Sequence, residues 1–157
     1  MKKILVYHDK GAIPFCVTSL VSALQQEHID STHEICFANR ALIQTTGWQK
    51  ETKLLVFPGG ADIPYHQALK GLGNQYIADY VKQGGNYLGI CAGGYYGSSF
   101  IEFEQGGPLE VIAERELKFF PGIARGPAYG LGKFCYQTQR GAQISQLIPN
   151  EKIKITH

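Results

Sequence analysis

A cysteine placed between two closely spaced glycines limits the fold of this chain more than any other feature. Residues 86–94 form a short apolar strand that runs into the pattern Gly89-x-Cys91-x-Gly93. A nucleophile on a sharp strand-to-helix turn has strained backbone, so the positions two before and two after it must be nearly free of side chain. The pattern predicts a nucleophile elbow, with the Cys91 sulfur at a helix start where N–H groups and the dipole favour thiolate. A buried small cysteine in a glycine-rich turn is the alternative.

A second glycine turn follows an earlier buried strand. Lys53–Phe57 is apolar and ends at Pro58-Gly59-Gly60-Ala61-Asp62. Two glycines after a buried strand can present bare N–H groups, as an oxyanion hole requires. Parallel strands end at the same edge of a sheet, so Gly60 and Cys91 are expected in one crevice, with the Ala92 amide as second donor. An ordinary strand-ending turn is the alternative.

Strand and helix patterns alternate along the first part of the chain. The predicted strands cover Lys3–Tyr7, His33–Phe37, Lys53–Phe57 and the residues that lead into Cys91. The predicted helices cover Pro14–Glu27, a short segment capped by Asn39, and Tyr65–Gln83, which Gly71–Asn74 interrupts. This alternation predicts an α/β fold, a three-layer sandwich with a mainly parallel sheet.

The pattern changes after the cysteine. Short strand-like pieces at 102–104, 109–112 and 117–120 predict a small β excursion from the core. Pro121–Pro127 is predicted as a loop, and Lys133–Gln137 as a further strand.

Composition limits the class of protein. The 157 residues fit a single domain over 1–157, and 44% hydrophobic with 18% charged residues is typical of a soluble globular protein. A net charge of +2 without a basic run, and the lack of a long apolar stretch, predict no nucleic-acid or membrane partner. The four widely spread cysteines indicate neither a zinc site nor disulfides and favour a cytoplasmic setting. We expect a small-molecule substrate or ligand and no cofactor or metal, and we leave a homodimer open.

Several segments together resemble a known family. They are Leu55–Asp62 with Pro64-Tyr65, Leu88–Gly97, Arg115-Glu116-Leu117 with Phe119–Gly122, and Arg125–Ala128. Over roughly residues 3 to 137 the chain resembles the class I glutamine amidotransferase-like superfamily and, more narrowly, the biotin–protein ligase N-terminal domain family. The resemblance implies a flavodoxin-like sheet, with Cys91 as nucleophile and the Gly60 and Ala92 amides at the oxyanion site.

The resemblance has two limits. It does not imply biotin ligation, because the glycine- and arginine-rich loop of the ligase catalytic domain is absent from these residues. Amidotransferase relatives carry a later histidine and acidic partner, whereas this sequence ends at His157 without an H-x-E pair. We therefore expect a shortened version of the family.

A thiol nucleophile normally needs a base within hydrogen-bond reach. His8, beside Asp9 at the end of the first strand, and His66, near Asp62, are the candidate bases. For each of them, the alternative to a catalytic base is an ordinary solvated histidine. Glu102 and Glu104 are expected on one strand face, either near the elbow or facing solvent.

Other residues are candidates for contact with the substrate. Arg125 could bind a carboxylate with its two-pronged guanidinium, or be an exposed loop charge. The remaining candidates are Gly59 and Asp62 in the turn, and Tyr95 and Tyr96 after the elbow. Two functions stay open: a cysteine hydrolase or amidotransferase-like enzyme that forms a thioester, and a non-catalytic binding or regulatory domain that keeps the pocket.

Overall fold

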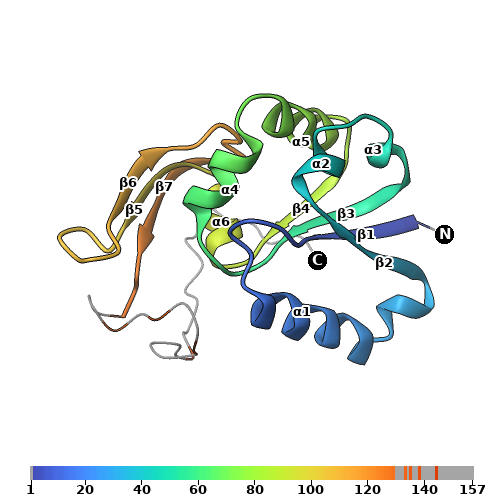
Figure 1. Cartoon of the computed structure of the whole chain (residues 1–157), viewed down its shortest axis with the longest axis horizontal. Coiled ribbons are helices and arrows are strands. Elements are labelled where there is room, and N and C mark those ends of the chain that lie inside the picture. Colours follow the sequence, from blue (N-terminus) through green and yellow to red (C-terminus); the bar gives the residue numbers. More distant parts are fainter. Residues whose placement is uncertain (1, 130–132, 134, 136–137, 139–143, 145–157) are drawn as a thin grey trace, which may run out of the picture.

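Four parallel strands form the main sheet in a computed structural model that describes residues 2–129, 133, 135, 138 and 144 (Figure 1). The strands are β1 (Lys2–Tyr7), β2 (His33–Ala38), β3 (Thr52–Phe57) and β4 (Asn86–Gly89). They lie in the order β2-β1-β3-β4, and all three neighbouring pairs are parallel. This order belongs to a doubly wound sheet, in which sites form outside the carboxyl ends of the strands.

Helices cover both faces of this sheet. One face carries α1 (Pro14–Gln26), which is followed by the short 3₁₀ turn η1 (Ile29–Ser31). The other face carries α2 (Arg40–Ile43), α3 (Trp48–Glu51), α4 (Asp62–Leu69) and α5 (Leu72–Lys82) (Figure 1). The predicted three-layer α/β sandwich is therefore confirmed. In the part of the chain that the structure describes, no helix is both long and apolar enough to cross a membrane.

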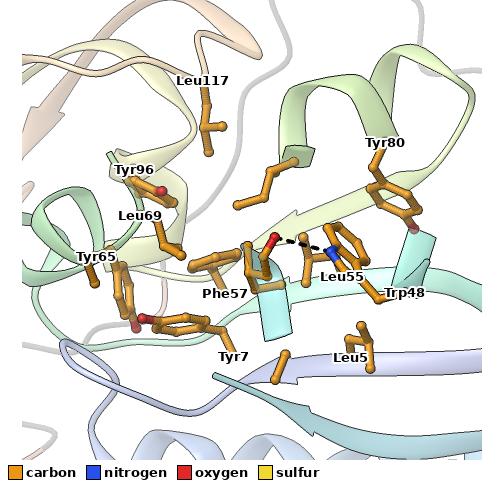
Figure 2. Close-up of a cluster of buried hydrophobic side chains, with 14 of the residues drawn as sticks. Leu5, Tyr7, Trp48, Leu55, Phe57, Tyr65, Leu69, Tyr80, Tyr96 and Leu117 are labelled. Atoms are coloured by element: carbon orange, nitrogen blue, oxygen red, sulfur yellow. Dashed lines mark hydrogen bonds between the residues drawn. The ribbon is translucent and has the colours of Figure 1, made fainter. Parts of the chain in front are cut away.

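The core under α4 and α5 is rich in aromatic rings (Figure 2). Tyr7 stacks on Phe57 with 4.7 Å between ring centroids, and Tyr65 meets both rings edge-on. Trp48 is also buried, and its indole nitrogen donates to the Ile43 carbonyl at 3.3 Å. Because these rings lock the ends of β1 and β3, the loops at that edge start from rigid positions.

A second, smaller sheet follows the cysteine. It contains β5 (Ser98–Phe103), β6 (Val111–Glu114) and β7 (Phe120–Gly126) in the order β6-β5-β7, and α6 (Ala92–Tyr96) leads into it. β5 pairs antiparallel with β6 and parallel with β7. Figure 1 shows it beside the α4–α6 end of the main sheet, which confirms the predicted β excursion.

The predicted loop over 121–127 is wrong. Most of it is β7, an edge strand that pairs Ala124 with Ile101 and Arg125 with Glu102. An edge strand tolerates Pro121 because one side of it needs no N–H donor. The strand predicted over 117–120 is also wrong, since only Phe120 belongs to a strand.

Two helix predictions also needed correction. The helix predicted over 65–83 consists of α4 and α5, separated at Lys70 and Gly71, where Gly71 has a φ of 75°. The sequence pattern also missed α3, which is only one turn long. The strand predicted over Lys133–Gln137 lies largely outside the described residues.

Candidate functional site

Cys91 occupies the sharp turn between β4 and α6. β4 ends at Gly89, α6 begins at Ala92, and Cys91 has φ 52° and ψ −111°. Such backbone strain costs on the order of 1–3 kcal/mol and gathers at functional sites. The residue is exposed, as a nucleophile must be. The predicted strand–cysteine–helix geometry is confirmed, although α6 has only five residues and therefore a short dipole.

Gly89 and Gly93 are required because backbone atoms approach them closely. A Cβ on Gly89 would lie 2.4 Å from the Gly93 carbonyl oxygen, and one on Gly93 would lie 2.2 Å from the Phe57 carbonyl oxygen. Neither oxygen can swing aside as the end of a side chain could. The contact to Phe57 also seats α6 against the end of β3.

The glycine turn after β3 is fixed by the segment that follows β1. The Ala61 amide donates to the Gly11 carbonyl at 2.9 Å, and the Ile13 amide donates to the Gly59 carbonyl at 3.2 Å. A Cβ on Gly60 would lie 1.9 Å from the Gly11 oxygen, so only glycine fits there. These contacts hold the turn beside the elbow.

Two amides at this edge are uncommitted. Among the described residues, neither the Gly60 N–H nor the Ala92 N–H donates a hydrogen bond. Ala92 is the first residue of α6, and such an amide has no partner inside its helix. Both groups are therefore available to an oxygen that develops negative charge near Cys91.

A cleft of about 430 Å³ opens beside Cys91. Its walls include Pro58, Gly59 and Gly60 from the turn and Ile90 from the elbow. The remaining wall residues come from the start of α1 and from two described residues near the end of the chain: Ile13, Phe15, Cys16, Ser19, Leu20, Ala23, Cys135 and Thr138. The predicted meeting of Gly60 and Cys91 in one crevice is thus observed, and Gly59 lines the same cleft.

Cys16 is a close neighbour of Cys91. A Cβ on Gly59 would lie 2.9 Å from the Cys16 sulfur and 3.7 Å from the Cys91 Cβ. Burial, together with the neighbouring Cys91 sulfur, raises the pKa of the Cys16 thiol. Burial also raises the pKa of Cys36, on β2. Cys16 and Cys36 are therefore poorer nucleophiles than free thiols at neutral pH.

Neither candidate base is part of this cleft wall. His8 follows β1, and its ring lies edge-on to Phe37 of β2, with 5.2 Å between centroids. β3 separates β1 from β4, which puts His8 about 10 Å across the sheet from the elbow strand. Among the described residues, no histidine lines the cleft.

His66 lies on α4 and lines a different pocket, together with Arg115. Its Nδ1 atom is buried and has no hydrogen-bond partner among the described residues. Burial and then the charge of Arg115 lower the pKa of His66. The imidazole is therefore neutral at pH 7.

Four charged candidates from the sequence already have partners within the protein. They are Asp62, Arg125, Glu102 and Glu104. Asp62 is buried and accepts from Arg115 Nε at 2.8 Å. Arg125 lies on β7 and forms a 2.6 Å ion pair with Glu102. Glu104 does not share a strand face with Glu102, because it follows β5 with a φ of 47° and is fully buried.

The two tyrosines of α6 are not among the described residues that line the cleft. Tyr95 packs against Phe103 of the small sheet, with 5.4 Å between ring centroids. Tyr96 is fully buried in the aromatic core, where its hydroxyl donates to Asn74. Both anchor the helix that follows the cysteine.

The sequence profile of a family described as "Biotin-protein ligase, N terminal" matches residues 2–156. The chain belongs to this family. Two relatives extend the comparison, and both are longer than the chain. An uncharacterized protein of Chlamydia muridarum is 44% identical over 148 residues, which is 94% of the chain and 57% of that protein. A biotin–protein ligase of Schizosaccharomyces pombe is 34% identical over 146 residues, 92% of the chain and 23% of the ligase.

Sequence reasoning missed one wall of the site in this biotin–protein ligase N-terminal domain. The wall is α1, which contributes Cys16, Ser19, Leu20 and Ala23. Their spacing places them along one side of a helix, and this was the available signal. The described residues include no cluster of three or more His, Cys, Asp or Glu side chains suited to a metal ion.

Proposed function

We propose that this domain is a cysteine-dependent hydrolase or amidotransferase-like domain that acts on an amide or ester through a Cys91 thioester. The observation that carries the proposal is the strained, exposed Cys91 in one cleft with Gly60, beside two amides that donate no hydrogen bond within the described part of the chain. A cysteine at positive φ is expensive, and a purely structural cysteine has no need of it. Burial raises the thiol pKa values of Cys16 and Cys36 above the ordinary value, which makes these two residues poorer nucleophiles.

The proposed reaction has two stages. The Cys91 thiol releases its proton to solvent and its sulfur attacks the substrate carbonyl, so a C–S bond forms and the carbonyl electron pair moves onto oxygen. The Gly60 and Ala92 amides stabilise that oxyanion by donating to it. Collapse of the intermediate breaks the bond to the leaving nitrogen or oxygen, which takes a proton from solvent. Water then hydrolyses the thioester, releases the acid and restores the thiol.

Turnover is expected to be slow. No described imidazole lines the cleft, and the two candidate bases named from the sequence, His8 and His66, are not on its described wall. A well-placed general base contributes about 10²–10⁴-fold to a rate. Acylation of Cys91 should therefore be easier to detect than repeated turnover.

The composition of the described cleft wall also favours a second function, a binding or regulatory domain without catalysis. Without an imidazole or carboxylate on the described cleft wall, the domain could bind a small molecule without converting it. Such a binding or regulatory domain keeps the pocket, but the Cys91 sulfur does not react with the ligand. Cys91 substitution then leaves ligand affinity unchanged.

Intact-protein mass spectrometry after mixing with a p-nitrophenyl ester separates the two functions. We expect one acyl adduct, mapped to Cys91, and its loss in Cys91→Ser, a nearly isosteric change. Cys36→Ser is the matched control, because Cys36 does not line the cleft, and it should acylate like the parent. Labelling at another cysteine, or none at all, would contradict the enzyme and favour the binding domain.

A further inference from the structure

The cleft beside Cys91 extends along one helix. Cys16, Ser19, Leu20 and Ala23, here called the α1 stripe, lie at positions i, i+3, i+4 and i+7 and all line the cleft. Cys16 is the member next to Cys91, since both are neighbours of Gly59. From Cys16 to Ala23 the helix rises about 10 Å. The cleft is therefore an elongated slot with the nucleophile at one end.

The described wall of the slot carries no charged side chain. Apart from the cysteine thiols, it consists of aliphatic and aromatic groups, backbone, and the hydroxyls of Ser19 and Thr138. Ile13, Phe15, Leu20 and Ile90 are its largest apolar side chains. A substrate with an ammonium and a carboxylate, such as free glutamine, would lose hydration there without gaining a partner.

The two charged residues that the sequence predicted to contact the substrate, Arg125 and Asp62, form ion pairs with other residues. Arg125 pairs with Glu102 on the small sheet, and Asp62 pairs with Arg115. Neither ion pair lines the slot. The site thus offers oxyanion donors and apolar surface, and this combination suits an uncharged acyl group.

We propose that the substrate is an ester or thioester of a linear apolar carboxylic acid, with its carbonyl at Cys91 and its chain along the α1 stripe toward Ala23. This inference rests on the proposed function and names its substrate class. The sulfur of Cys91 forms the new C–S bond, the alcohol or thiol leaves with a solvent proton, and water later releases the free acid. Each further methylene of the acyl chain removes apolar surface from water when it enters the slot, so a longer chain is bound more tightly.

The test compares acyl chain lengths on the full chain. The probes are p-nitrophenyl acetate, butyrate and octanoate, followed by p-nitrophenolate release and by the mass of the Cys91 adduct. We expect the second-order acylation rate, corrected for the uncatalysed reaction with free cysteine, to rise at least tenfold from acetate to octanoate. γ-Glutamyl-p-nitroanilide, which carries the charges of glutamine, should not acylate Cys91.

A matched pair of variants locates the acyl chain. Ala23→Phe fills the far end of the slot and should lower the octanoate rate at least tenfold, and by a much larger factor than the acetate rate. Ser22→Phe adds the same ring to the preceding residue of α1, which is exposed and does not line the cleft, and both rates should stay at the parent values. Circular dichroism confirms that both variants are folded.

Each opposing result has a distinct meaning. The proposal of an apolar acyl chain would be wrong if acetate and octanoate had equal corrected rates, or if Ala23→Phe and Ser22→Phe had equal effects. Neither result would argue against Cys91 as the nucleophile. Acylation by the γ-glutamyl probe would point to an amidotransferase substrate instead. No Cys91 adduct with any ester would overturn the proposed function and this inference together.

Discussion

Single atoms decide which residues the elbow accepts. Gly93 and Gly94 are adjacent in α6, but a Cβ on Gly93 would meet the Phe57 oxygen at 2.2 Å, whereas the nearest atom to one on Gly94 is 3.5 Å away. We expect Gly93→Ala to destabilise the fold by roughly 1–3 kcal/mol or more, as overpacking does. Gly94→Ala should be neutral or stabilising by up to about 1 kcal/mol, since alanine favours helix. Urea unfolding measures both, and equal effects would contradict the seating of α6 on β3.

Between elements, one buried ion pair connects the small sheet to the main domain. Arg115 follows β6, and Asp62 begins α4; both are buried, and the guanidinium makes two hydrogen bonds to one carboxylate oxygen. Arg115→Met leaves the carboxylate buried without its partner, which should cost about 3–5 kcal/mol of unfolding free energy. Arg125→Met breaks an exposed pair instead and should change stability little. Chemical denaturation compares them, and a similar loss in both would contradict the importance of burial.

A second link between elements depends on pH. Glu116 accepts from the Gly71 amide at 3.0 Å and from Asn74 Nδ2 at 2.7 Å. Partial burial acts to raise the pKa of Glu116, but these hydrogen bonds, together with the charges of His66 and Lys70, outweigh it and hold the pKa below its usual value. The stability contributed by Glu116 is therefore present above its unfolded pKa of about 4.3 and is lost as the pH falls through the lower folded value.

Glu116→Gln should accordingly lose less unfolding free energy than the parent protein between about pH 5 and pH 3. Glutamine keeps an acceptor for Gly71 and Asn74 but does not titrate. Urea unfolding at each pH measures the difference. Parallel losses in the variant and the parent would mean that Glu116 does not contribute to the acid sensitivity.

For the whole molecule, the separation of His8 and His66 from the cleft predicts a slow reaction in which neither of them serves as the base. His8 lies beside Phe37 across the sheet, and His66 lines a different pocket. We expect His8→Ala and His66→Ala to retain most of the Cys91 acylation rate, and Cys91→Ser to lose it. Stopped-flow acylation measures all three. A loss of about 10²–10⁴-fold in either histidine variant would instead identify that residue as the general base.

The sequence by itself determined the layers and the elbow. Strands and helices followed from apolar runs and periodicity within single segments, and Pro14 and Asn39 marked helix starts, with the Leu42 amide donating to Asn39 at 2.9 Å. The spacing of Gly89 and Gly93 around Cys91 required a strand-to-helix turn, because the steric demand there is local. Segments rich in glycine and proline misled the prediction where strand pairing outweighed local preference, as in β7.

Only the tertiary structure decided what surrounds Cys91. The α1 wall of the cleft and the Arg115–Asp62 pair join residues 35 or more positions apart, and no local pattern encodes such contacts. Strand order placed β3 between β1 and β4, and so put His8 across the sheet from the cysteine with which the sequence had grouped it. The physical reason is that local sterics and periodicity fix each turn and element, whereas the neighbours of a side chain depend on how the whole sheet is ordered and packed.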